Sequence, residues 1–314
     1  MKRKISLLMI LAVFAVLTAA CASKDSSGTG ANNDSDTITV KHQFGETPVK
    51  KNPKKVVVFD FGILETMDRL GVEAAGVPKD NLPSYLDKYK GSKYENVGGL
   101  MEPNFEKINE MKPDLIIISG RQQDSYDKFA EIAPTVFMGF DYKDYMGSFK
   151  KNMTTVGEIF DKEEEVKAEV AKIEDNIESV KEHVASGNGK ALITLTSGGK
   201  VTAFGPGSRF GIIHDVLGIK PAADDLDADP RHGQNISFEY LVERNPDILF
   251  VVDRDAAVGE GQSAKKVIEN SLVKKTNAYK NGNIIYLNPE YWYLAGGGLV
   301  SVGEMVQEVD KGLK

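Results

Sequence analysis

The sequence predicts an α/β fold in which two Rossmann-like lobes, each with a central and mostly parallel sheet, are joined by a long α-helix and enclose a ligand cleft. Three observations predict it. One helix–turn–strand unit occurs once in each half, short apolar strands alternate with helical patterns in both halves, and a long helical stretch lies between them. Strands that alternate with helices are typical of parallel sheets covered by helices. The 314 residues are enough for two medium-sized cores.

The repeated unit runs from Asn104 to Arg121 and again from Ser237 to Arg254, and the two copies align without a gap. Each copy predicts a short amphipathic helix, a Pro-Asp turn and a buried parallel strand. An arginine follows the strand in each copy. Because open α/β sheets bind ligands at the carboxyl ends of their strands, we expect Arg121 and Arg254 to face one cleft from the two lobes.

The amino terminus has the pattern of a secretory signal. Lys2, Arg3 and Lys4 precede an apolar run from Ile5 to Leu17, and small residues follow before Cys21, the only cysteine. The run is short for a permanent membrane span, although an uncleaved anchor is the alternative. We expect residues 1–20 to be a signal peptide and residues 21–36, rich in Ser, Gly, Asn and Asp, to be a lipidated cysteine with a flexible tether.

The rest of the chain is predicted to form an N-terminal lobe (37–145), a connecting helix (146–185) and a C-terminal lobe (186–314). The first lobe opens with an alternating strand of a small hairpin at 37–42, followed by a buried strand at 56–59 and a helix that ends at Gly71. Asp161 and Glu164 have capping-box spacing, so we expect the connecting helix to kink or restart there. The second lobe repeats the strand–helix order, from a strand at 191–196 to a closing helix from about Val300.

Composition excludes several kinds of site. The net charge of −7 argues against nucleic acid, which needs a basic face. Four scattered histidines and one cysteine indicate no all-protein metal site. The loop from Gly205 to Gly211 fits neither the dinucleotide-binding GxGxxG pattern nor a GxSxG nucleophile elbow, so we interpret it as a flexible loop that presents Arg209.

Three arginines in loops after strands, Arg121, Arg209 and Arg254, are candidates for binding an anion. A guanidinium stays charged, binds oxygens in pairs and stacks on aromatic rings, so three of them together suit a polyanionic aromatic chelate. The alternative is that each forms a surface or interlobe salt bridge.

Two further segments carry candidate ligand-binding residues. The cluster Tyr291-Trp292-Tyr293 has no apolar period, which favours a ligand surface and makes Trp292 and Tyr293 candidates. A phenol can also bind ferric iron directly. His232 lies in a polar loop before the second repeat, on the predicted cleft side, and the alternative is an ordinary surface histidine.

These features resemble those of the siderophore-binding lipoproteins of bacterial iron-uptake ABC transporters, over essentially the whole mature chain. The shared features are the lipobox, the two lobes with a helical connection, and the paired [NS]-F-E-x-[IL] and [KN]-P-D motifs. A narrower similarity is to the subgroup that takes ferric catecholates, including petrobactin-binding lipoproteins of Gram-positive bacteria. It rests on Gly120-Arg121, Gly207 to Gly211, Arg231-His232-Gly233, Asp253-Arg254 and Tyr291 to Gly297.

The resemblance implies roles for these residues. Arg121, Arg209 and Arg254 would surround catecholate oxygens, and His232 and Tyr293 would complete the coordination of iron held by a siderophore with only four ligand atoms. Glu106 and Glu239, one per lobe, would dock on a two-fold permease. A duplicated exposed carboxylate is what a pseudo-symmetric receptor needs for a symmetric partner.

We therefore expect a non-catalytic, monomeric receptor on the outer face of the cell membrane of a Gram-positive bacterium, anchored by lipid on Cys21. It would capture a ferric catecholate or mixed catecholate–citrate siderophore, petrobactin-like, and deliver it to an ABC permease with its ATPase. Iron(III) would be carried as the chelate, without an intrinsic cofactor and without nucleic acid as a partner. The alternative within this fold is a haem receptor; an exported hydrolase using Ser208 or His232 and a surface adhesin are alternatives from other classes.

Overall fold

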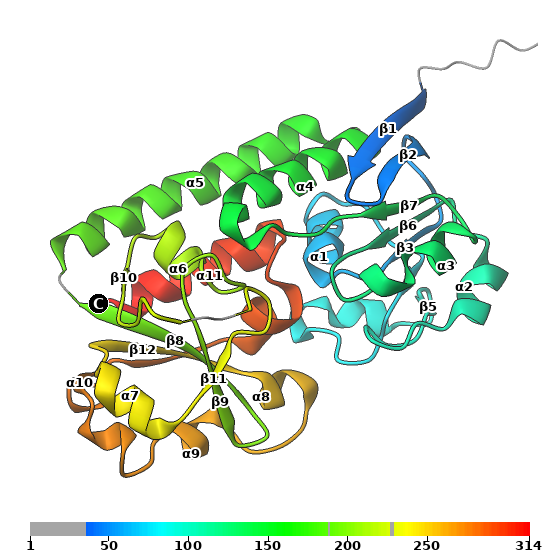
Figure 1. Cartoon of the computed structure of the whole chain (residues 1–314). Helices are drawn as coiled ribbons and strands as arrows, with labels where there is room; N and C mark the ends of the chain where they lie inside the picture. The colour runs from blue at the N-terminus through cyan, green and yellow to red at the C-terminus, as the bar shows by residue number, and fades with distance from the viewer. Residues whose placement is uncertain (1–35, 188, 227–228) are drawn as a thin grey trace, which may run out of the picture. The chain divides into compact units, whose positions relative to one another are not determined.

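The computed structural model describes residues 36–187, 189–226 and 229–314. The predicted signal peptide, Cys21 and residues 21–35 of the tether lie outside the described residues. Figure 1 shows two α/β lobes with the helices α4 (Tyr145–Phe160), α5 (Glu163–Ser186) and α11 (Leu299–Gly312) running along them. The prediction of two lobes with a helical connection is therefore confirmed.

The N-terminal lobe is built on a five-stranded, all-parallel sheet in the order β5-β4-β3-β6-β7. The predicted hairpin, β1 (Thr37–His42) with β2 (Gly45–Lys50), is antiparallel and separate from this sheet. The strands are β3 (Val56–Val58), β4 (Gly76–Val77), β5 (Glu95–Asn96), β6 (Leu115–Ile118) and β7 (Thr135–Phe137). The helices are α1 (Phe61–Arg69), α2 (Phe105–Met111) and α3 (Tyr126–Ala130), with the short turns η2 (Ser84–Lys90), η3 (Gln123–Ser125) and η4 (Tyr142–Asp144).

The C-terminal lobe has a mixed sheet in the order β11-β9-β8-β12-β13, with β10 paired to β8. Its strands are β8 (Lys190–Ser197), β9 (Lys200–Phe204), β10 (Lys220–Pro221), β11 (Gln234–Ile236), β12 (Ile248–Asp253) and β13 (Ile284–Leu287). Its helices are α6 (Ile212–Asp215), α7 (Phe238–Arg244), α8 (Arg254–Val258), α9 (Ala264–Ile268), η5 (Val273–Lys275), α10 (Asn277–Lys280), η6 (Glu290–Ala295) and α11 (Leu299–Gly312).

The second sheet differs from the first because β8 and β9 form an antiparallel hairpin. Only Gly198 and Gly199 separate the two strands, and both have positive φ (+55° and +77°). A two-residue connection joins antiparallel strands, and it needs φ > 0, which glycine adopts without strain. β9 in turn pairs antiparallel with β11. The parallel pairs described in this lobe are β8 with β10, β8 with β12, and β12 with β13.

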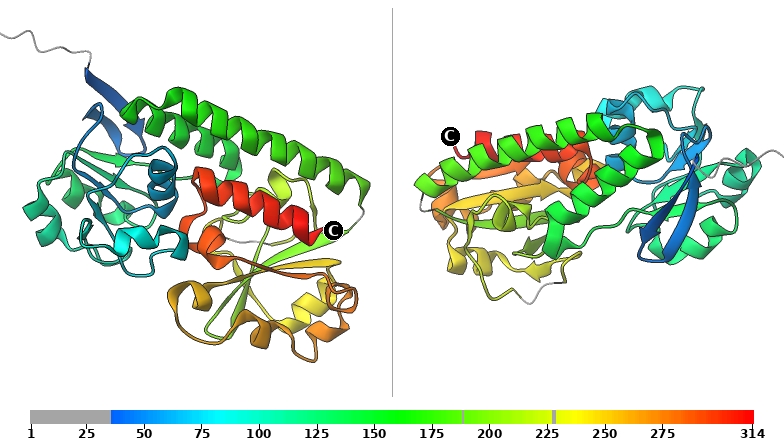
Figure 2. Two further views of the ribbon diagram at one scale, coloured as in Figure 1. Left: turned by 180° about the vertical axis from the view of Figure 1, so that it is seen from behind. Right: turned by 90° about the horizontal axis from the view of Figure 1, so that it is seen from above.

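The connecting segment consists of two helices, α4 (Tyr145–Phe160) and α5 (Glu163–Ser186). They meet at Asp161, which has a left-handed backbone (φ +51°) and accepts a hydrogen bond from Lys51 Nζ at 2.7 Å. The break predicted at Asp161 is therefore real, and it turns the chain enough for α4 to pack against α5. Figure 2 shows α5 running beside α11 of the C-terminal lobe. Among the described helices, none combines the length and apolar character needed to cross a bilayer.

One apolar core extends through both lobes. Alternate strand residues face it, such as Ile117 in the first sheet and Ile193 in the second, and α1, α4, α5 and α11 cover it. The opposite faces of the two sheets have separate, smaller cores under α2 and α3 and under α7, α9 and α10. Because one continuous apolar core includes residues of both lobes, the lobes pack directly against each other and are not joined by a flexible linker alone.

Candidate functional site

The two copies of the repeated unit fold alike. Asn104 caps α2 and Ser237 caps α7, each accepting a hydrogen bond from a backbone N–H of the first turn. Both helices end at a left-handed residue, Lys112 (φ +47°) and Asn245 (φ +41°). The strands that follow, β6 and β12, lie next to the first strand of their lobe. Each copy therefore delivers its terminal arginine to the same edge of its sheet.

Arg121 reaches from the N-terminal lobe to the main chain of the C-terminal lobe. Its Nη1 donates to the carbonyl oxygen of Leu294 at 3.1 Å and its Nη2 to that of Tyr293 at 2.5 Å. Gln122 is buried and fixes the loop, because it accepts from the backbone N–H of Ser119 at 3.2 Å and donates to another loop. The guanidinium is therefore held in place before any ligand arrives.

Arg254 is the first residue of α8, directly after β12. Its Nε donates to the hydroxyl of Tyr293 at 3.1 Å and its Nη1 to Ser197 Oγ at 3.3 Å. The carboxylate of Asp255 lies 3.7 Å from the same Nη1. Arg254 therefore has an ion-pair partner within its own lobe, and its side chain remains 35 % exposed.

Tyr293 joins the three predicted arginines. Arg209 Nη2 donates to the Tyr293 carbonyl oxygen at 2.5 Å, the acceptor that Arg121 also uses. The guanidinium carbons of Arg209, Arg121 and Arg254 lie 4.6, 5.8 and 5.9 Å from the centre of the Tyr293 ring. These distances are within the range of cation–π attraction. The structure therefore brings Arg121, Arg209, Arg254 and Tyr293 into one cluster between the lobes.

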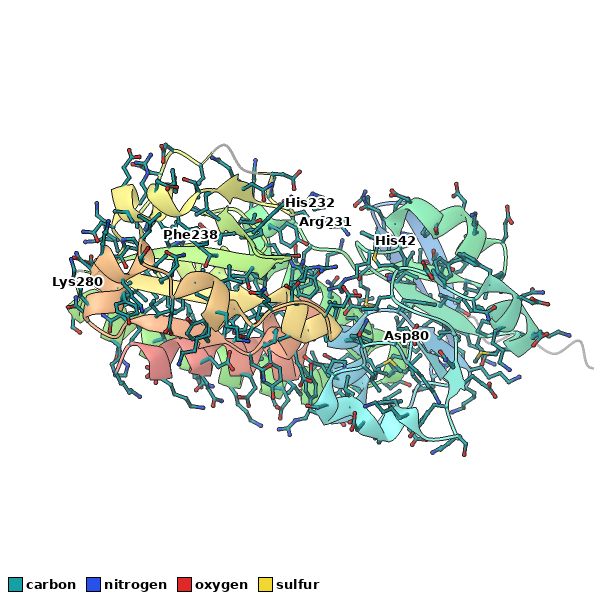
Figure 3. The ribbon with its side chains drawn as sticks, turned by 90° about the horizontal axis from the view of Figure 1, so that it is seen from below. His42, Asp80, Arg231, His232, Phe238 and Lys280 are labelled. Atoms are coloured by element: carbon teal, nitrogen blue, oxygen red, sulfur yellow. The ribbon has the colours of Figure 1, made fainter. Side chains whose placement is uncertain are left out.

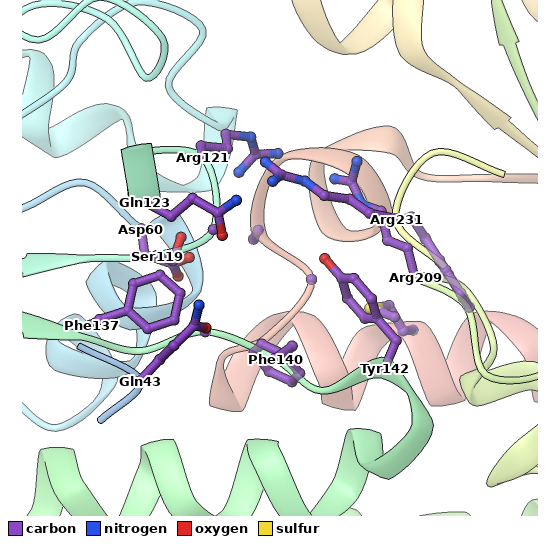
Figure 4. A pocket seen from close by; sticks show the side chains of 16 residues that line it. Gln43, Asp60, Ser119, Arg121, Gln123, Phe137, Phe140, Tyr142, Arg209 and Arg231 are labelled. Atoms are coloured by element: carbon purple, nitrogen blue, oxygen red, sulfur yellow. The ribbon is translucent and has the colours of Figure 1, made fainter. Parts of the chain in front are cut away.

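A cavity of about 250 Å³ opens beside this cluster, with walls from both lobes (Figure 4). It is slightly smaller than the usual 300–1,000 Å³ of small-molecule sites, so a chelate bound there would protrude. Aromatic and polar side chains alternate with cations along its wall. The lining side chains are Gln43, Asp60, Ser119, Arg121, Gln123, Phe137, Phe140, Tyr142, Arg209, Arg231, Trp292 and Met305. A larger cavity of about 540 Å³ near the ends of α5 and α11 has no arginine in its wall.

The cavity is electropositive. Burial, followed by the charge of Arg121 and more weakly that of Arg231, lowers the pKa of the Arg209 guanidinium to about 10. Asp60 is the one acidic residue in the wall, and its carboxylate is engaged as the N-cap of α1, accepting from the Ile63 N–H at 2.9 Å. Among the described wall residues, three guanidinium groups therefore outnumber one carboxylate, which suits an anionic ligand.

The structure places Trp292 and His232 differently from Tyr293. Trp292 contributes to the cavity wall but is only 1 % exposed, and its indole N–H donates to Glu308 Oε2 at 2.8 Å. The predicted aromatic loop is in fact the wide helical turn η6, which points Trp292 into the core and leaves Tyr293 half-buried. His232 has a side chain that is 74 % exposed and pairs with Asp229 at 3.0 Å, and it does not line the cavity.

Glu106 and Glu239 are exposed, each in the first turn of its repeated helix. Within the described residues there is no group of three or more His, Cys, Asp or Glu side chains able to hold a metal ion. Arg231, Tyr142, Gln43 and Gln123 line the cavity without having been selected from the sequence. Of these four residues, only Arg231 could have been noticed in the sequence, because it stands beside the candidate His232.

Comparison with known proteins identifies the family. The family described as "Periplasmic binding protein" matches residues 56–291. The chain belongs to this family. The petrobactin-binding protein YclQ of Bacillus subtilis (strain 168) is a relative that is 50 % identical, with 99 % of each chain aligned. Membership also confirms the prediction of a binding protein rather than an enzyme.

Solved structures of periplasmic binding proteins agree with this assignment. The crystal structure of YclQ superposes with a TM-score of 0.86 and 52 % identity, covering 88 % of this chain and 99 % of that one. The periplasmic catecholate-siderophore binding protein VctP from Vibrio cholerae superposes with a TM-score of 0.83 and 37 % sequence identity, over the same shares of the two chains. The siderophore-binding protein BauB, bound to a complex of two acinetobactin molecules and ferric iron, superposes with a TM-score of 0.82 and 34 % sequence identity. The match again covers 88 % of this chain and 99 % of that one. These relatives give no support to the haem alternative.

Proposed function

We propose that this chain is an extracytoplasmic receptor that captures a ferric siderophore, catecholate or mixed catecholate–citrate and petrobactin-like, and hands it to an ABC permease and its ATPase. The observation that carries the proposal is the cluster of Arg121, Arg209 and Arg254 around Tyr293, beside an interlobe cavity in which the described arginines outnumber the one carboxylate, Asp60. The 50 % identity to petrobactin-binding YclQ supports the choice of ligand.

The chemistry of the cavity suits such a cargo. In a ferric catecholate the chelator holds the iron, and the excess negative charge lies on catecholate oxygens at the rim of flat aromatic rings. Guanidinium groups bind such oxygens in pairs and stack on ring faces. The aromatic wall residues Phe137, Phe140 and Tyr142 add apolar contact. The protein then needs no intrinsic cofactor, because iron(III) arrives and leaves as cargo.

Two of the proposed roles concern the iron itself. Tyr293 and His232 would act as direct iron ligands only for a siderophore that offers four donor atoms. The hydroxyl oxygen of Tyr293 accepts a hydrogen bond from Arg254 Nε, and an iron ion bound to this oxygen would replace that hydrogen bond. His232 is on a loop at the edge of the C-terminal lobe nearest the other lobe (Figure 3) and would have to turn from Asp229 toward the chelate.

The remaining roles concern location and partners. Glu106 and Glu239 occupy equivalent exposed positions in the two lobes, which supports docking of a monomer on a pseudo-two-fold permease. A lipid on Cys21 and the tether of residues 21–36 would hold the receptor at the outer face of the membrane. One relative, YhfQ of Bacillus subtilis (strain 168), is named a putative ABC transporter substrate-binding lipoprotein and is 27 % identical.

Fluorescence titration tests the ligand assignment. Trp292 is a suitable reporter because its ring lies 6.3 Å from that of Phe210, over which the guanidinium of Arg209 is placed. Ferric petrobactin is expected to quench the emission strongly, and a ferric hydroxamate only weakly. Arg121→Ala combined with Arg254→Ala should weaken ferric petrobactin binding about 100-fold or more, since charged hydrogen bonds contribute about 1.5–3 kcal/mol each.

The control is Arg69→Ala, which removes an exposed ion pair with Glu169 far from the cavity. An equal response to both chelates, or undiminished binding by the double variant, contradicts the catecholate assignment. A Soret shift on addition of haem would revive the haem alternative.

A further inference from the structure

Arg231 is a third arginine in the cavity wall, beside Arg121 and Arg209, and it crosses between the lobes. It belongs to the C-terminal lobe, yet its guanidinium carbon lies 3.9 Å from the position that a Cβ on Gly120 would occupy in the N-terminal lobe. Figure 4 shows Arg121 entering from one side of the cavity and Arg209 and Arg231 from the other. The Arg231 side chain therefore extends over the cavity rather than lying behind its wall.

The backbone that carries Arg231 is fixed. Asp229 Oδ1 accepts hydrogen bonds from the backbone N–H groups of Arg231 at 2.8 Å and His232 at 2.7 Å. The backbone N–H of Arg209 donates to the Pro230 carbonyl oxygen at 2.7 Å, which ties this loop to the one beneath it. Any movement at this position is therefore a movement of the side chain.

Among the residues that the structure describes, the side chain of Arg231 is the least engaged of the four arginines. Arg121 and Arg209 donate to main-chain carbonyl oxygens, and Arg254 donates to Tyr293 and Ser197. The guanidinium of Arg231 has no hydrogen bond or ion pair with any of the residues that the structure describes. A guanidinium has five N–H donors, so this arginine has the largest unused binding capacity of the four.

Within the described residues, the charge of Arg231 also has no carboxylate paired with it. Together with Arg121 it opposes the charged form of the nearby Arg209, whose guanidinium is already disfavoured by burial. An anion in the cavity would attract each of these guanidinium groups and so offset their mutual repulsion. Arg231 is half-buried, so it is free to change rotamer as the anion enters.

We propose that Arg231 is a specificity-determining residue that folds over the exposed side of the bound anionic chelate and slows its release. This inference rests on the proposed function, which supplies the ligand. Arg121, Arg209 and Arg254 form a fixed cradle, and Arg231 is the adjustable contact that distinguishes anionic chelates from neutral ones of similar size. A contact that closes after the ligand has entered governs the dissociation rate, whereas a charge at the rim governs the association rate.

Stopped-flow fluorescence with ferric petrobactin separates these roles. Arg231→Gln is expected to raise the dissociation rate about tenfold, because one charge-assisted hydrogen bond to the chelate is lost. Arg231→Lys keeps the charge without the planar fork and should recover part of the loss. The matched control is Lys143→Gln, which removes one exposed cation near the loop of Gly207 but outside the cavity wall. It should leave the dissociation rate unchanged.

The outcomes are distinct. A dissociation rate for Arg231→Gln within twofold of wild type, or an equal change in Lys143→Gln, overturns the inference while leaving the proposed function intact. Failure of the wild-type protein to bind ferric petrobactin overturns both. Circular dichroism checks that Arg231→Gln is folded; if it is not, a dissociation rate in Arg231→Lys equal to that of wild type overturns the inference by itself.

Discussion

Glu65 is a buried carboxyl group at the contact between the lobes. It lies on α1, is 1 % exposed, and accepts from the hydroxyl of Tyr85 and from the backbone N–H of Ser301, both at 2.6 Å. Ser301 belongs to the first turn of α11, where unpaired N–H groups favour an anion. Burial nevertheless outweighs these bonds and raises the pKa of Glu65 to about 7, with Asp60 adding to the effect. Tyr145 and Tyr291 are the other titratable side chains close to it.

This pKa predicts how stability depends on pH. The ordinary value for the carboxyl group is 4.5, so between about pH 4.5 and 7 the folded protein binds more protons than the unfolded chain. The free energy of unfolding must then fall as pH rises through this window, by at most about 3 kcal/mol. Glu65→Gln, which does not titrate, should lack this loss.

Urea unfolding of wild type and Glu65→Gln at several pH values between 5 and 8 checks the prediction. The difference between the two proteins is the quantity to follow, because buried His214 acts in the opposite direction. Burial lowers the pKa of His214 below 6.5, so its contribution is lost as pH falls. A difference curve that stays flat from pH 5 to 8 would contradict the assignment to Glu65.

At the scale of secondary-structure elements, the repeated unit depends on its Pro-Asp turn. Asp114 Oδ2 accepts from the backbone N–H groups of Lys54 at 2.9 Å and Lys55 at 2.8 Å, just before β3. Asp247 Oδ2 accepts from the backbone N–H of Lys190 at 3.0 Å, at the start of β8. The carboxylate therefore fastens the turn before one strand to the beginning of its neighbour, in both lobes.

Asp114→Ala and Asp247→Ala should each lower the free energy of unfolding by about 1–2 kcal/mol, because charged acceptors of backbone N–H groups are lost. The sites lie in different sheets without shared partners, so their effects are expected to add in the double variant. Urea denaturation of the two single variants and of the double variant measures their free energies of unfolding. Asp175→Ala on the exposed face of α5 serves as the control, and a loss no larger than the control's would show that the turn is held by other contacts.

The sequence was informative where local pattern decides structure. Period and turn residues predicted the two helix–turn–strand units, and parallel topology then predicted the edge at which Arg121 and Arg254 lie. The β8–β9 hairpin was missed, although Gly198-Gly199 between two apolar runs is a recognisable hairpin signal. The aromatic stretch 291–293 was taken for a loop because a wide helical turn has no distinctive period.

The rest of the cavity could not be predicted because its walls come from loops whose paths are set by tertiary contacts. Arg231 reaches the cavity through the bond between Arg209 N–H and the Pro230 carbonyl oxygen, and Gln43 is placed there by the β1–β2 hairpin. Neither relationship has a counterpart in sequence spacing. The orientation of Trp292 likewise depends on Glu308, in another helix.

At the scale of the whole described unit, the contact between the lobes is tight. A Cβ on Gly298 would lie 2.0 Å from the Gly62 carbonyl oxygen, so α1 and the start of α11 approach as closely as glycine allows. Thr66 Oγ1 accepts from the Leu299 N–H at 3.0 Å across the same contact. Together with the shared core along α4 and α5, this packing leaves little freedom for the lobes to open and close.

The cleft should therefore be largely preformed. Small-angle scattering of the ligand-free protein and of the protein loaded with ferric petrobactin is expected to show nearly the same radius of gyration. A large decrease on loading would mean that the lobes swing together as the chelate binds. The Arg231 inference would remain unaffected, because it concerns one side chain.

The anchoring of the arginines has a consequence for how cargo is unloaded. Arg121 and Arg209 are held by main-chain carbonyl oxygens, which carry no proton to lose, and the pKa of Arg209 stays near 10. The charge of the Arg209 guanidinium is therefore the same in mildly acidic and mildly alkaline surroundings. Acidification adds protons and leaves this charge in place. We expect release to be accelerated by a partner that competes for Tyr293 and its arginines, or by a change in the charge of the chelate itself.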